Sequence, residues 1–144
     1  MTEPAARDLI LVVAAAILSG ERCLVGQRRR GDSLGGMWEF PGGKVELEES
    51  LEAAIHREIA EELATEIRIL SYLGEEIITR PDRDIRLCIF LTELAGPEPQ
   101  PIEHEALRWL GAGEFEHLPL APADRFAIPQ VELELRARRF ARRS

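Results

Sequence analysis

Three glutamates stand close together in a segment with helical periodicity. Glu58, Glu61 and Glu62 are spaced i, i+3 and i+4, so a helix places them on one face within about one turn. Like charges at these spacings repel each other by roughly 0.2–0.5 kcal/mol per pair. A divalent cation held between the carboxylates would turn that repulsion into attraction, and Mg²⁺ prefers a few carboxylates together with substrate phosphates. A solvated acidic helix face is the alternative interpretation.

The glutamates fall near the end of a predicted helix. Ser50 is a suitable N-cap residue, and apolar residues recur at helical spacing from there to about Leu63. The apolar face of this helix consists of Leu51, Ala54, Ile55, Ile59 and Leu63. The loop Pro41-Gly42-Gly43 precedes the helix, and its glycines allow the main chain to come close to other groups. A carboxylate-rich helix end beside such a loop is compatible with a metal-assisted phosphate site and also with a solvated acidic face.

Short strands and turns make up most of the remaining chain. Strand-like patterns cover residues 9–18, 22–27, 38–40, 67–73, 75–79, 85–93 and 106–110. Pro41-Gly42-Gly43 stops the third of these strands, and Pro129 opens a final helix that runs to about Ala141. This order predicts one α+β domain over residues 1–144, with a mixed sheet and helices on both of its sides.

The net charge limits the class of partner that fits this chain, and the two cysteines indicate its redox compartment. The net charge of −8 argues against a nucleic-acid polymer as partner, because phosphate backbones select basic surfaces. A single nucleotide remains compatible, since a metal can bridge its phosphates to carboxylates. Cys23 and Cys88 lie in apolar runs, which fits buried packing in a reducing, cytoplasmic compartment. The apolar run at residues 9–18 is too short to span a membrane and reads as a buried strand.

The spacing of the charged residues resembles the Nudix box. Gly43 is followed after five residues by Glu49, and after seven more by Arg57-Glu58-Ile59-x-Glu61-Glu62. Two positions depart from the family pattern, because Ala64 replaces a glycine and Thr65 replaces an aliphatic residue. Ala is strained in the left-handed conformation that ends such a helix. We therefore expect this helix to run on slightly or to end differently.

The resemblance implies a Nudix α/β/α sandwich and a divalent-metal site, with Mg²⁺ as the cofactor and Mn²⁺ as an alternative. It implies the catalytic residues Glu49, Arg57, Glu58, Glu61, Glu62 and Glu103, and the metal ligands Gly42, Glu58, Glu61, Glu62 and Glu103. Arg57 is expected to pair with Glu49, although an i,i+4 pair with Glu61 is an alternative. The proton acceptor stays open between Glu103, Glu105, Glu61 and Glu62. His104 and His56 are weaker candidates for that role.

Two further segments, residues 38–45 and 118–124, resemble the MutT branch of the family, and the resemblance covers roughly Val12 to Leu133. This branch cleaves nucleoside triphosphates between the α and β phosphorus, releasing a nucleoside monophosphate and pyrophosphate. It implies the substrate-binding residues Arg28, Phe40, Lys44, Arg83 and Asp124. Surface exposure is the alternative for Arg28, Lys44 and Arg83, and core packing is the alternative for Phe40.

Asp124 carries the clearest indication of base specificity. The oxidised-guanine enzyme of the branch has Asn at this position, and ionised Asp only accepts hydrogen bonds whereas Asn also donates. A protonated Asp would recover the donor, which requires a raised pKa. We predict hydrolysis of 8-oxo-dGTP by a monomer or homodimer without a membrane partner. The alternatives are CTP or 5-substituted dCTP, an ADP-ribose-type substrate suggested by Pro81, and a catalytically silent sensor.

Overall fold

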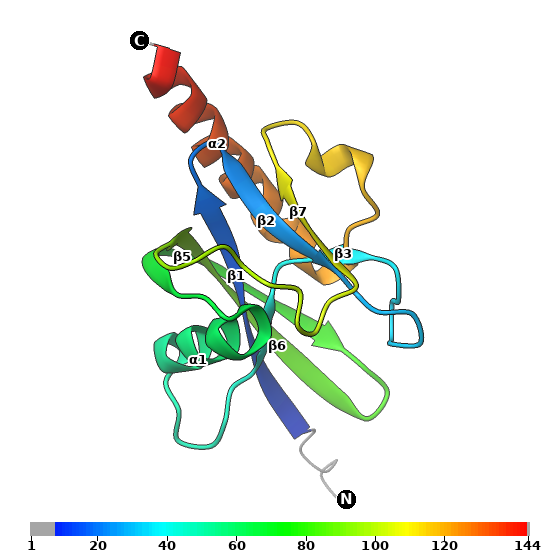
Figure 1. Cartoon of the computed structure of the whole chain (residues 1–144). Coiled ribbons are helices and arrows are strands. Elements are labelled where there is room, and N and C mark those ends of the chain that lie inside the picture. The colour runs from blue at the N-terminus through cyan, green and yellow to red at the C-terminus, as the bar shows by residue number, and fades with distance from the viewer. Residues whose placement is uncertain (1–7, 144) are drawn as a thin grey trace, which may run out of the picture.

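The computed structural model describes residues 8–143, which form a seven-stranded sheet with helices against it (Figure 1). The strands are β1 (Asp8–Ser19), β2 (Arg22–Gln27), β3 (Trp38–Glu39), β4 (Gly42–Lys44), β5 (Ile67–Thr79), β6 (Arg83–Leu94) and β7 (Ala106–Leu110). The helices are α1 (Leu51–Leu63) and α2 (Ile128–Arg143), with short 3₁₀ segments at Phe115–His117 and Pro122–Ala127. Neither α1 nor α2 has the length and apolar character needed to cross a bilayer.

Strand β1 organises the sheet by pairing along both of its edges. On one edge it runs parallel to β6 from Asp8↔Arg83 to Leu18↔Glu93. Its other edge is shared by two antiparallel strands, with β4 opposite residues 12–14 and β2 opposite residues 18–19. β5 completes one side of the sheet against β6, and β3 and β7 pair with β2. The sheet is therefore mixed, as the sequence predicts.

Alternation along β1 explains why the helices lie on opposite faces. Residues 13, 15 and 17 pack in one cluster with the apolar face of α1, whereas residues 14, 16 and 18 pack in another with Val131 and Leu135 of α2. Successive side chains of a strand point to opposite faces, so a strand buried on both sides reads as a continuous apolar run. The predicted strand at 9–18 and the layered architecture are both confirmed.

Two predicted boundaries are wrong. Residues 67–79 form the single strand β5, because register shifts at Ile69/Ser71 and Tyr72/Gly74 let it stay paired with β6 across Gly74. The sequence interpretation read this glycine as a break between strands. Likewise, Pro41 ends β3, but pairing resumes at once as β4. The reason is that the Pro41 carbonyl accepts a hydrogen bond from Ala15 N–H at 2.8 Å, which brings the chain onto β1.

Helix α1 begins and ends with defined caps. The Ser50 hydroxyl accepts a hydrogen bond from Ala53 N–H at 3.0 Å, as predicted for the N-cap. At the other end, Ala64 adopts the left-handed conformation (φ 53°, ψ 41°) and its N–H donates to the Ala60 carbonyl. The helix does not run on, so Ala takes a conformation that normally favours glycine. Thr65, which donates to the Pro97 carbonyl at 2.5 Å, helps to hold this turn.

Candidate active site

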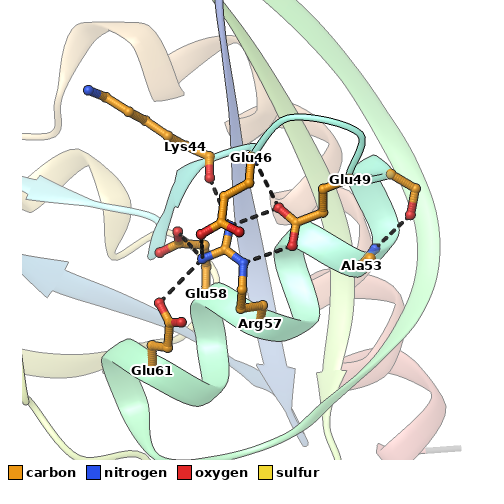
Figure 2. A network of polar contacts seen from close by, with 8 residues as sticks. Lys44, Glu46, Glu49, Ala53, Arg57, Glu58 and Glu61 are labelled. Atoms are coloured by element: carbon orange, nitrogen blue, oxygen red, sulfur yellow. Dashed lines mark hydrogen bonds and ion pairs between the residues drawn. The ribbon is translucent and has the colours of Figure 1, made fainter.

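Arg57 ties helix α1 to the loop that precedes it (Figure 2). Its Nε and Nη2 donate to the two carboxylate oxygens of Glu49, each at 2.8 Å. Nη2 also donates to the Lys44 carbonyl at 2.9 Å, and Nη1 donates to Glu58 at 2.8 Å. The paired hydrogen bonds from Arg57 lower the pKa of Glu49 to about 2. The expected Arg57–Glu49 pair is present.

Two of the predicted site residues are exposed beside this network, and the side chain of only one of them contacts Arg57. The Glu61 side chain is 58% exposed and lies 3.3 Å from Arg57 Nη1, so the i,i+4 contact is present as well. Figure 2 shows the Lys44 side chain extending away from the carboxylates. Lys44 lines a separate groove beside Leu9 and Leu47, at the start of β1. A role for Lys44 in phosphate contact would require its side chain to swing towards the carboxylates.

Gly42 and Gly43 bring β4 close to both β1 and helix α1. A Cβ on Gly42 would overlap the Val13 carbonyl, and a Cβ on Gly43 would overlap the Glu58 carboxylate. Gly42 N–H donates to Glu62 Oε2 at 3.2 Å. The glycine loop thus forms a cradle for two of the predicted metal-binding carboxylates, which any larger residue would fill.

Glu62 lines a cavity of about 200 Å³. The lining residues are Arg28, Asp32, Glu39, Gly42, Glu62, Glu103 and His104. Burial, followed by the nearby charges of Glu58, Glu103 and Glu39, raises the pKa of Glu62 to about 9. A divalent cation would offset this repulsion, so the donor chemistry fits one. Within residues 8–143, no three His, Cys, Asp or Glu side chains are already arranged to hold a metal ion.

The lining of the same cavity includes a polar cluster that the sequence interpretation only partly anticipated. Glu39 Oε1 accepts from Arg28 Nη1 at 2.8 Å, and Glu39 Oε2 lies 3.0 Å from His104 Nε2. Burial opposes ionisation of Glu39, but the hydrogen bonds from His104 and Arg28 outweigh it, so the pKa of Glu39 falls below its ordinary value. Glu39 was not among the predicted site residues. The sequence feature that could have indicated it is a charged residue between two aromatic residues, Trp38 and Phe40, in a short predicted strand.

A second cavity, of about 440 Å³, adjoins the first through Arg28. Its lining consists of Arg28, Ser33, Leu34, Arg80, Pro81, Asp82, Arg83 and Ile85. Two of the predicted substrate-binding arginines therefore share one pocket, contributed by the segment after β2 and by the β5–β6 turn. Arg28 and Arg83 therefore do not lie on a fully solvated surface. With Arg80 they bring three guanidinium groups to this cavity, which makes it suitable for anionic or acceptor-rich groups.

A hydrogen bond joins Phe40 to the buried Asp124. The Phe40 ring is 4% exposed and packs edge-on against Phe115, at a centroid distance of 6.2 Å, so the ring belongs to the core. Phe40 N–H donates to Asp124 Oδ2 at 2.8 Å. Burial raises the pKa of Asp124 to about 7, and the charges of Glu39 and Arg28 act on it in opposite directions. Asp124 is thus electrostatically linked to Arg28, the residue that joins the cavities.

Comparison with known proteins identifies the family of this site. The NUDIX domain model matches residues 9–131 of the chain. The chain belongs to the Nudix family. It is a Nudix hydrolase, and enzymes of this family act on small nucleotide substrates and generally use divalent metal cations.

Nudix relatives align over most of the chain. A Mycobacterium tuberculosis protein named as a candidate 8-oxo-dGTP diphosphatase is 41% identical, covering 80% of this chain and 82% of the relative. The Escherichia coli CTP pyrophosphohydrolase is 38% identical, covering 91% and 96%. The solution structure of the E. coli ORF135 protein superposes with a TM-score of 0.76 at 35% identity, covering 94% of this chain and 96% of that one.

The predicted catalytic and metal-binding residues, together with Lys44, divide into three groups. Gly42, Glu62 and Glu103 line the same cavity as Arg28. The Glu58 carboxylate lies against Gly43, and its charge contributes to the raised pKa of Glu62. The remaining residues support or flank the cavity: Glu49 and Arg57 hold the loop against α1, while Glu61 and Lys44 face solvent.

Proposed function

We propose that this Nudix hydrolase is a Mg²⁺-dependent nucleoside triphosphate pyrophosphohydrolase of the MutT type. It would release a nucleoside monophosphate and pyrophosphate. The observation that carries the proposal is the meeting of Gly42, Glu62 and Glu103 with Arg28 in one cavity. Carboxylates and a guanidinium in one cavity suit a cation and a polyphosphate chain, respectively.

Each residue has a role in this proposal. Glu58, Glu62, Glu103 and the Gly42 carbonyl would hold the cation, with Glu61 approaching from the exposed face. When bound, the cation would neutralise phosphoryl charge and lower the pKa of a water molecule. Glu103 would accept the proton of the attacking water, which adds at the β phosphorus while the nucleoside monophosphate leaves. Arg28 and Arg83 would contact the substrate, and Arg57 with Glu49 would hold the loop and helix in register.

Asp124 supports oxidised dGTP as the substrate. With a pKa of about 7, its carboxyl group is partly neutral near physiological pH, so it can donate a hydrogen bond as well as accept one. An oxidised guanine presents both donors and acceptors, and a neutral Asp124 would meet this mixed edge. The biological role would then be removal of 8-oxo-dGTP from the nucleotide pool.

CTP or a 5-substituted dCTP is the second candidate. An ionised Asp124 would accept from the exocyclic amino group of cytosine, and the relative with 96% coverage is named CTP pyrophosphohydrolase. Because specificity is a ratio of kcat/KM values, we would compare kcat/KM for 8-oxo-dGTP, dGTP, dCTP and CTP. A preference for the cytosine nucleotides would overturn the first assignment.

The activity itself is tested by measuring pyrophosphate release from a panel of triphosphates with Mg²⁺ and with chelator. We expect release with Mg²⁺ and none with chelator. ADP-ribose serves as the control substrate, and faster AMP release from it than from any triphosphate would assign the enzyme to a different Nudix activity. Absence of hydrolysis of every nucleotide would favour a ligand sensor.

A further inference from the structure

The loop that carries Glu103 is fastened by the residue that follows it. Resting on the proposed function, we propose that His104 is a positioning residue, which holds Glu103 at the cavity through its contact with Glu39. His104 does not need to exchange a proton with substrate in this role. It determines where the neighbouring carboxylate lies.

His104 is enclosed on two sides. It is 6% exposed, and its Nε2 lies 3.0 Å from Glu39 Oε2 on β3. The imidazole also lies directly against the main chain of β2 at Gly26, where a Cβ would come within 2.6–2.8 Å of three ring atoms. The absence of a side chain at Gly26 therefore creates the slot that the ring occupies, and Glu39 closes the end of that slot.

Glu39 extends the contact to the substrate side of the cavity. Its other oxygen accepts from Arg28 Nη1 at 2.8 Å, and Arg28 Nε donates to the Ser33 carbonyl at 2.6 Å. One carboxylate thus joins the Glu103 loop to the arginine that lies between the two cavities. Each Glu39 oxygen has its own cationic or N–H partner, which fixes the carboxylate in one orientation.

Hydrogen bonds to main-chain groups hold the loop on either side of Glu103. Before it, Ile102 N–H donates to the Glu62 carbonyl at 3.3 Å, and Arg29 Nη2 donates to the Ile102 carbonyl at 2.6 Å. After it, Glu105 N–H donates to the Gln27 carbonyl at 2.9 Å. The exposed Glu103 side chain is therefore directed by its neighbours, and His104 supplies the buried side-chain contact among them.

This arrangement predicts an effect on turnover more than on binding. Misplacement of a catalytic group by about 1 Å can reduce the rate by about 10²-fold. Loss of the His104–Glu39 contact would displace Glu103 and lower kcat, while Arg28 would keep its bond to Glu39 and leave KM little changed. A merely structural histidine would lower the melting temperature without this division between kcat and KM.

A matched pair of substitutions tests the contact. In His104→Gln the amide nitrogen reaches about as far as Nε2 does and can still donate to Glu39, whereas His104→Asn is shorter by one methylene. We expect kcat to fall about tenfold or more in His104→Asn, with KM within about twofold, and most of kcat to return in His104→Gln. His117→Asn, at an exposed position outside both cavities, is the control and should keep wild-type kinetics.

Combination with Glu103→Gln shows whether His104 acts through Glu103. If it does, the double variant His104→Asn/Glu103→Gln loses little more activity than Glu103→Gln alone. Effects that multiply, a wild-type kcat in His104→Asn, or an equal loss in His104→Gln would each overturn the proposal. If His104→Asn does not fold, His104→Met replaces it in the cycle, because methionine can fill the slot beside Gly26 but cannot donate to Glu39.

Amide hydrogen exchange in the metal-free protein provides a readout without activity. The amides of Ile102 and Glu105 should exchange about tenfold faster in His104→Asn than in wild type, and near the wild-type rate in His104→Gln. Unchanged exchange in His104→Asn would contradict the proposal. A wild-type protein that hydrolyses no triphosphate would refute the proposed function, whereas this exchange measurement would still decide whether His104 holds the loop.

Discussion

Phe40 N–H donates a hydrogen bond to Oδ2 of the buried Asp124, at 2.8 Å and across 84 positions of the chain. One carboxylate oxygen is thereby committed to the main chain of the segment between β3 and β4. In the proposed function, the carboxyl group would also contact the base of the substrate. Because burial raises the pKa of Asp124 to about 7, the protonation of this group changes within the physiological pH range.

The raised pKa makes folding stability pH-dependent. The stabilising effect of protonating Asp124 is fully present below its ordinary pKa of 3.8 and is lost as pH rises through about 7. Asp124→Asn cannot ionise and escapes this loss. We expect the variant to gain roughly 1–3 kcal/mol relative to wild type between pH 5 and pH 8. Urea denaturation at both pH values measures this, and an equal difference at the two would contradict it.

The same ionisation should change base preference. As Asp124 loses its proton it can only accept, which favours the amino group of cytosine over the mixed edge of an oxidised guanine. The ratio of kcat/KM for 8-oxo-dGTP to that for dCTP should therefore fall as pH rises through about 7. Asp124→Asn should show a flat ratio, and a parallel decline in the variant would exclude Asp124 as the cause.

Glu62→Gln should separate catalysis from folding. The buried carboxylate is surrounded by Glu58, Glu103 and Glu39, and its replacement removes a predicted metal ligand while Gly42 N–H keeps an acceptor. We expect turnover to fall by about 10²-fold or more, with little change in melting temperature in chelator. Mg²⁺ should raise the melting temperature of wild type and do so less in the variant. Glu58→Gln should behave alike, and retention of most activity would remove that residue from the ligand set.

Arg57→Lys tests the fastening of the glycine loop to α1. A lysine cannot reproduce the paired bonds to Glu49 together with those to Lys44 and Glu58. We expect a loss of about 1–3 kcal/mol in unfolding free energy and a lower kcat. Arg68→Lys, whose side chain is 66% exposed and pairs with Glu93, is the control and should change stability by less than about 0.5 kcal/mol. Equal effects of both substitutions would show that the network has no special role.

Ala64→Gly should stabilise the protein. Ala64 ends α1 in the left-handed conformation, which costs a non-glycine residue about 1 kcal/mol. Relief of that cost should raise the unfolding free energy by about that amount. Ala60→Gly, on the exposed face inside the same helix, should instead destabilise by about 1 kcal/mol. Thermal denaturation of the two variants should give shifts of opposite sign, and shifts of the same sign would contradict the assignment of strain at Ala64.

Local patterns predicted the helix α1, its Ser50 cap and the buried strand β1, because each depends on residues near one another in the chain. The Arg57–Glu49 pair was expected from the resemblance to the Nudix box. Long-range contacts account for what was missed. Strand β4 exists because Gly42 can lie against Val13, and β5 stays continuous because β6 runs beside its bulges. Glu39 is positioned by His104 and Arg28. These three residues lie on segments that come together only in the folded sheet.

One edge of β1 is divided between β4 and β2. The glycines that lie against Glu58 and Glu62 belong to β4, and the segment bearing Arg28 follows β2. Both are therefore anchored to the same strand, β1, which is buried on its two faces. Motion of β1 would move the glycine loop and the Arg28 segment together, so we expect the distance between the carboxylates and Arg28 to vary little.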